Sequence, residues 1–169
     1  MVGLFRGQEA APQPGTVANM LSTRLVRLIE DHAEELTRGV LDDLQHNART
    51  LSYHKLSREE LHHRVYTVYR NLGDWLGHVA EEGIEAAYCE LGQTRQAEGI
   101  PLSEVIYALL LTKYHLREHI RSRGLVDSAV ELYQEQELQR LVGRFFDRAI
   151  YHTVRGYEHA GRPAVKSAV

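Results

Sequence analysis

Apolar residues recur at helical spacing along most of this chain, and short polar stretches separate the repeats. Between about residues 17 and 46 the stripe positions lie three or four residues apart while charged residues occupy the other faces, which is the pattern of an amphipathic helix. The stripe is formed by Leu21, Leu25, Leu28, Ile29, His32, Leu36, Val40 and Leu44. The pattern stops over residues 47–56. A capping box from Ser57 to Glu60 then predicts a second helix that extends to about residue 79.

Three further helices are predicted in the second half of the chain. They cover residues 84–95, 102–123 and about 128–159, with Gly124 as the residue that ends the middle one. A second capping box marks the start of the last helix at Ser128. No segment alternates apolar and polar residues as a strand does. The expected fold is therefore all-α, a bundle of about five main helices.

The connection between the third and fourth helices predicts a sharp corner. The stripe of the third helix is formed by Ile84, Tyr88 and Leu91. Arg95 falls at the next position of this stripe, so its charge needs a partner inside the fold. Gly99 can end the helix in a left-handed cap, and Pro101 fits the first turn of the next helix because its missing N–H costs nothing there.

The last helix has an apolar surface broader than one stripe. Its members that point in neighbouring directions are Leu141, Val142, Phe145, Phe146, Ala149 and Ile150. In a monomer a terminal helix would leave some of them exposed, which favours a two-fold homodimer built mainly from this helix with help from the fourth. The alternative is a last helix that is central to its own bundle.

Composition limits the classes of function. A chain of 169 residues supports one domain, and a net charge of -3 gives no general attraction to nucleic acid. The single cysteine, Cys89, cannot form an internal disulfide, and no apolar run approaches a membrane span or a secretory signal. We expect a cytoplasmic protein that binds neither nucleic acid nor membrane. Residues 1–16 and 161–169 read as mobile tails, which leaves 17–160 as the domain.

The corner segment LGQTRQAEGIP, residues 91–101, resembles the proximal segment of globin-coupled sensors. Leu91-Gly92 matches its start and Gly99-Ile100-Pro101 its end, while Arg95 occupies the position of the iron-binding histidine. A guanidinium has no lone pair to offer iron. With that substitution residues 20–159 resemble the non-haem globin sensor domains of RsbR-type stressosome proteins, the RsbT co-antagonists. The resemblance implies a globin-like, non-enzymatic, homodimeric regulator in the stress response, without a cofactor, which passes a signal to a protein partner.

Three residues are candidates for binding a small ligand. They are Arg95, Tyr88 and His32, the last being either a pocket residue or a hydrogen-bonded core histidine. Some related non-haem sensor globins bind fatty acids, which would make Arg95 a carboxylate partner. Haem held by another histidine stays open as an alternative, through His78, His115 or His152.

Metal-dependent catalysis is a further alternative. His115, Glu118 and His119 fit the H-x-x-E-H pattern of inverted zinc peptidases, although nothing downstream marks a further ligand. The motifs Glu59-x-x-His62 and Glu60-x-x-His63 resemble half of a di-iron site, but a solvated helix face explains them better. The sequence therefore predicts no metal site and no catalytic residue.

Overall fold

The computed structural model describes residues 14–77, 81–123 and 128–161, and within these ranges every regular element is a helix. Its elements are α1 (Pro14–Asp31), α2 (Ala33–His46), the 3-10 helix η1 (Leu51–Lys55), α3 (Arg58–Arg70), α4 (Leu72–Gly77), α5 (Glu81–Ala97), α6 (Leu102–Arg123) and α7 (Ala129–Gly161). The all-α prediction is confirmed. No helix in the described ranges has both the length and the apolar character needed to cross a membrane. Of the predicted tails, only residues 14–16 and 161 are described, as ends of α1 and α7, and Gly124 lies outside the described ranges.

The described helices number seven rather than about five because the first two predicted helices are each interrupted once. At His32 the backbone N–H donates a hydrogen bond to Ile29 O at 3.1 Å, and the ring Nδ1 lies 2.7 Å from Leu28 O. At Asn71 the side-chain amide donates to Thr67 O at 3.0 Å. Side chains that bond to their own helix backbone compete with continuous helix, so both interruptions have a local cause.

The predicted corner between α5 and α6 is confirmed in detail. Gly99 has φ +71°, and its N–H donates to Gln96 O while the N–H of Ile100 donates to Arg95 O, both at 3.0 Å. These two bonds form a Schellman motif, which satisfies carbonyls that the end of α5 leaves free. Pro101 follows directly, and α6 begins at the next residue. The Tyr157 hydroxyl donates to Ile100 O at 2.7 Å and ties the corner to α7.

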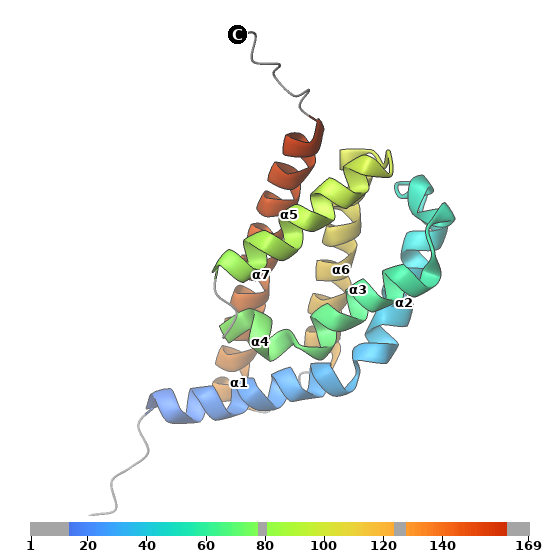
Figure 1. Cartoon of the computed structure of the whole chain (residues 1–169). Coiled ribbons are helices and arrows are strands. Elements are labelled where there is room, and N and C mark those ends of the chain that lie inside the picture. The colour runs from blue at the N-terminus through green and yellow to red at the C-terminus, as the bar shows by residue number, and fades with distance from the viewer. Residues whose placement is uncertain (1–13, 78–80, 124–127, 162–169) are drawn as a thin grey trace, which may run out of the picture.

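Helix α5 lies across α7 (Figure 1). The two backbones approach each other closely at one glycine of each helix. A Cβ on Gly92 would lie 2.1 Å from Thr153 O, and a Cβ on Gly156 would lie 2.1 Å from Cys89 O. Both distances are too short for any non-bonded contact, so only glycine fits at these two positions. The crossing therefore depends on one glycine from each helix.

The broad apolar surface of α7 is largely covered by the chain itself. Val142, Phe145, Phe146 and Ala149 are at most 1% exposed, and Leu141 and Ile150 are half-buried. Burial of the first four within one chain favours the alternative of a last helix that is central to its own bundle, because α7 is packed by α5, α6 and α1. Their aromatic members belong to the core, where the Phe145 and Phe146 rings lie 5.1 Å apart.

The glycine crossing generates a stability prediction. We expect Gly92→Ala and Gly156→Ala each to lower the free energy of unfolding by about 3 kcal/mol or more, because the new methyl group meets backbone that cannot move aside. Urea unfolding followed by circular dichroism measures the change.

Gly143→Ala is the matched control for the crossing. Gly143 also lies within α7, but nothing lies within 4 Å of its added Cβ. Alanine should therefore be neutral there or stabilise by up to about 1 kcal/mol through helix propensity. Equal effects at positions 92 and 143 would contradict the close contact.

Candidate functional site

A cavity of about 430 Å³ lies among α3, α5 and α6. Its wall is mainly apolar, with Leu61, Val65 and Val68 from α3, Ala87, Tyr88 and Leu91 from α5, and Val105, Ala108 and Leu109 from α6. Trp75 of α4, Phe146 of α7, Leu44 of α2 and Tyr53 of η1 also line it. Its size is within the range of small-molecule pockets, roughly 300–1,000 Å³.

Arg95 is the buried cation of this cavity, and its side chain is only 1% exposed. Its Nη1 donates to Glu98 Oε2 at 2.7 Å, and its Nη2 donates to the two Glu60 oxygens at 3.1 and 3.3 Å. Burial works against the charge, but the hydrogen bond to Glu98 and the fields of Tyr53, Glu60 and Glu98 outweigh it and raise the pKa of Arg95. The guanidinium therefore joins α3 to the C-terminal end of α5.

Tyr53 of η1 covers the Arg95 guanidinium from a third element. The Arg95 Cζ lies 5.5 Å from the centre of the Tyr53 ring, within the range of a cation–π contact. Burial raises the pKa of Tyr53 to about 12 against the opposing effect of Arg95, so its phenol stays protonated at neutral pH. Arg95 is thus held by two carboxylates and one aromatic face.

Tyr88, the second residue predicted to bind a ligand, also lines the cavity. Its ring packs edge-on against Phe145 at 5.8 Å and against Trp75 at 6.1 Å. Burial raises the pKa of Tyr88 well above its ordinary value. The aromatic group closes one part of the wall, and the structure brings Tyr88 and Arg95 to the same cavity.

His32, the third predicted ligand residue, does not line this cavity. It lies at the joint between α1 and α2, where its ring is 5.6 Å from that of His119 on α6. Burial, helped by nearby Arg123 and His32, lowers the pKa of His119. The reading of His32 as a hydrogen-bonded core histidine therefore fits better than a place in the pocket.

The histidines proposed for haem lie elsewhere or outside the described residues. His78 falls in the undescribed segment 78–80, and neither His115 nor His152 is among the lining residues. His115 Nε2 lies 3.1 Å from Asp43 Oδ2, and His152 Nε2 lies 2.9 Å from Glu81 Oε1. Haem held at this cavity through these two residues is not supported.

The inverted-peptidase pattern does not assemble a metal site in the described part of the chain. His115 pairs with Asp43, Glu118 with Arg121, and His119 faces His32. Two histidines on one helix without a converging third ligand do not make a catalytic zinc centre.

Sequence reasoning missed Glu60 and Glu98 as the partners of Arg95. Glu98 is three residues further on, a spacing at which helical side chains meet, so it could have been found. Glu60 is 35 positions away and was assigned to a solvated helix face. The only indication of Glu60 in the sequence was that a buried arginine needs carboxylate partners.

The site therefore holds a fixed cation beside a mainly apolar cavity. Residues 30–164 match the domain family described as RsbT co-antagonist protein rsbRD N-terminal domain. The chain belongs to this family. RsbRD N-terminal domains are regulatory signalling domains of the stress response, which confirms the resemblance found in the sequence. No curated protein and no solved structure matches the chain.

The ion pair of this RsbRD domain generates a second stability prediction. We expect Glu60→Gln to lower the free energy of unfolding by about 1 kcal/mol, because one charge-assisted partner of buried Arg95 is lost while Glu98 remains. The effect stays small because Glu60 is 36% exposed and water screens it. Thermal and urea unfolding measure it.

Glu59→Gln is the control, one residue away and exposed, with an expected change within about 0.5 kcal/mol. Because Glu60 also pairs with Arg64, the comparison is repeated in an Arg64→Met background. A loss that disappears in that background would assign the effect to Arg64 instead of Arg95.

Proposed function

We propose that this RsbRD N-terminal domain is a cytoplasmic, globin-like sensor domain that works without haem and without catalysis. It acts through dimerisation and through contacts with a signalling protein partner. The family supports a stress-response co-antagonist role. The observation that carries the haem-free reading is Arg95, buried at the cavity with its charge held by Glu60 and Glu98.

The chemistry of Arg95 explains why this cavity is unsuited to haem ligation at that position. Guanidinium remains protonated and has no lone pair for iron. Its two carboxylate partners also add negative charge beside the cavity, and removal of the arginine would leave this charge without its buried cation. The network stabilises the arginine and disfavours an axial ligand in its place.

Haem titration tests this proposal. We expect the wild-type domain to give no stoichiometric complex with a sharp Soret band when haem is added to the purified protein. Arg95→His and Arg95→Ala are titrated beside it, and uptake by Arg95→His alone would support the alignment with the iron-binding position. A sharp band in wild type that survives Arg95→Ala would show that another residue ligates iron and would refute the proposal.

A dimer needs an interface other than the buried residues of α7. Exposed apolar side chains remain on the two helices that the sequence named, with Leu110 44%, Tyr114 58% and Tyr151 58% exposed. The Lys113–Asp147 ion pair of 3.0 Å sets the register between α6 and α7. Tyr151 follows Asp147 by one turn, and the antiparallel course of the helices brings it toward Leu110. This α6–α7 face supports a two-fold contact.

Sedimentation velocity over a range of protein concentrations tests the dimer. We expect the wild type to dimerise and Tyr114→Glu to remain folded but monomeric, because the added charges would face each other across a two-fold axis. Tyr133→Glu is the control, since Tyr133 is 61% exposed near the start of α7. A wild type that stays monomeric at every concentration would refute the dimer.

A second candidate function is the binding of a small apolar ligand, which the volume and apolar wall of the cavity favour. A fatty-acid-like ligand would place its chain against Trp75, Tyr88 and Leu109. Its carboxylate would have to compete with Glu60 and Glu98 for Arg95. Native mass spectrometry of protein purified without denaturant distinguishes a retained ligand from none.

A further inference from the structure

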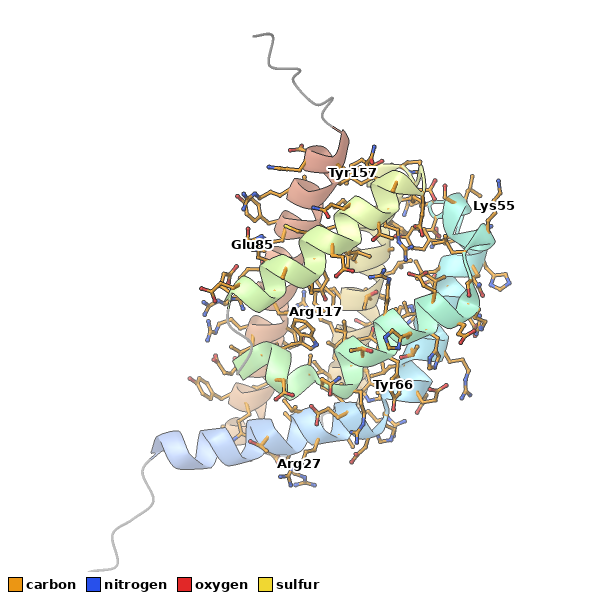
Figure 2. All side chains as sticks on the ribbon, in the orientation of Figure 1. Arg27, Lys55, Tyr66, Glu85, Arg117 and Tyr157 are labelled. Atoms are coloured by element: carbon orange, nitrogen blue, oxygen red, sulfur yellow. The ribbon has the colours of Figure 1, made fainter. Side chains whose placement is uncertain are left out.

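A second group of polar side chains lies on the face of α5 that packs against α7, away from the residues that line the cavity. It contains Glu81, Glu85 and Cys89 from α5 and His152 from α7. Figure 2 labels Glu85 on α5, on the part of that helix that crosses α7. The Cys89 thiol donates to His152 O at 3.4 Å, so the cysteine and the histidine are direct neighbours.

His152 is buried and uses only one of its two ring nitrogens. The residue is 5% exposed, and its Nε2 lies 2.9 Å from Glu81 Oε1. A carboxylate at neutral pH has no proton to donate and can only accept a hydrogen bond. Nε2 therefore carries the proton. The buried Nδ1 has no hydrogen-bond partner among the described residues, and in a neutral ring it presents a lone pair.

This arrangement is the one that a metal-binding histidine uses. Such a histidine donates its other ring N–H to a carboxylate, which fixes the ring and its tautomer. One ligand atom each from Glu85, Cys89 and His152 lie within 4.8 Å of one another. Tetrahedral zinc with bonds of about 2.0–2.3 Å needs ligand atoms about 3.3–3.8 Å apart, a difference that small side-chain rotations cover.

We propose that Cys89, Glu85 and His152 bind one Zn²⁺ ion between α5 and α7, with Glu81 as the positioning residue for His152. Thiolate, imidazole and carboxylate are the ligand types that zinc takes in proteins, and water completes the tetrahedron. The Cys89 thiol releases its proton to solvent on binding. Half-buried Glu85 and Cys89 leave the site a path from solvent.

The surroundings can accommodate the ion. Arg155, which donates to Glu85 at 3.2 Å, would give up this contact and keep its position over the Tyr151 ring, 5.7 Å from the ring centre. The backbones of Cys89 and Gly156 are already in contact at the helix crossing. Cys89 lies at this contact, and His152 directly precedes Thr153, whose carbonyl meets Gly92 at the same crossing. The backbone of both ligands is therefore fixed before the metal binds, which reduces the ordering cost of binding.

Calorimetric titration of the chelator-treated, desalted full chain with ZnCl₂ tests the site. We expect one ion per chain and a higher melting temperature of the zinc-loaded protein. Co²⁺ in place of Zn²⁺ should give the near-ultraviolet charge-transfer band of a thiolate ligand. This band reports Cys89 directly, because the chain has no other cysteine.

Variants separate this site from adventitious binding by surface histidines. We expect Cys89→Ser to lower the Zn²⁺ affinity by at least about 100-fold and Glu81→Gln by roughly 10–100-fold, as loss of an outer carboxylate does. His54→Gln, at an exposed histidine, is the control and should bind zinc as wild type does. Glu85→Gln, at a residue whose side chain is 44% exposed, provides a ligand variant that keeps the fold if Cys89→Ser does not.

Equal zinc affinity in wild type and in the folded Cys89→Ser or Glu85→Gln variant would overturn the proposal, as would a Co²⁺ complex without the thiolate band. Absence of zinc binding in wild type would overturn it as well. None of these results bears on the haem titration of Arg95, so the two proposals fail independently.

Discussion

The backbones of α5 and α7 meet where Gly92 lies against Thr153 and where Gly156 lies against Cys89. Helices that touch through backbone are held at one depth and one register, because no flexible side chain can adjust the spacing. Gly92 lies between Tyr88 and Arg95 on α5, so the crossing decides how far both reach into the core. The same crossing places Cys89 beside His152 on the adjoining face. The wall of the cavity and the neighbouring positions of Cys89 and His152 therefore both depend on the crossing of α5 and α7.

Arg95 shows how the domain manages a charge in its core. An unpaired guanidinium inside a protein is costly, and its burial is tolerated because two carboxylates and an aromatic ring surround it. Glu60 and Glu98 are each a little more than one third exposed, so they neutralise the cation while keeping part of their own hydration. Because water screens these partly exposed carboxylates, the ion-pair network contributes only modestly to the free energy of unfolding. The stronger effect is geometric, since the network joins α3, η1 and the end of α5.

The features that could be predicted from the sequence are those that depend on interactions between residues close together in the chain. The corner at Gly99 and Pro101 and the bounds of α6 were predicted because they depend on neighbouring residues. The breaks at His32 and Asn71 were missed because the apolar period continues through both, while the competing hydrogen bonds come from the side chains themselves.

At the candidate site, Arg95 and Tyr88 were predicted from one stripe on one helix. Glu60 was not, because the contact that brings it to Arg95 is tertiary. Phe145 and Phe146 were identified as apolar but assigned to a dimer seam, since periodicity shows that a face is buried and does not show what covers it.

Ile100 links the end of α7 to the base of Arg95 through its own peptide groups. Its carbonyl accepts from the Tyr157 hydroxyl and its N–H donates to Arg95 O. Two hydrogen bonds in series thus connect the last turns of α7 with the residue that carries the buried charge. These two hydrogen bonds form a short connection between α7 and the end of α5. A displacement of the last turns of α7 would therefore be transmitted to the backbone of Arg95 through these two hydrogen bonds.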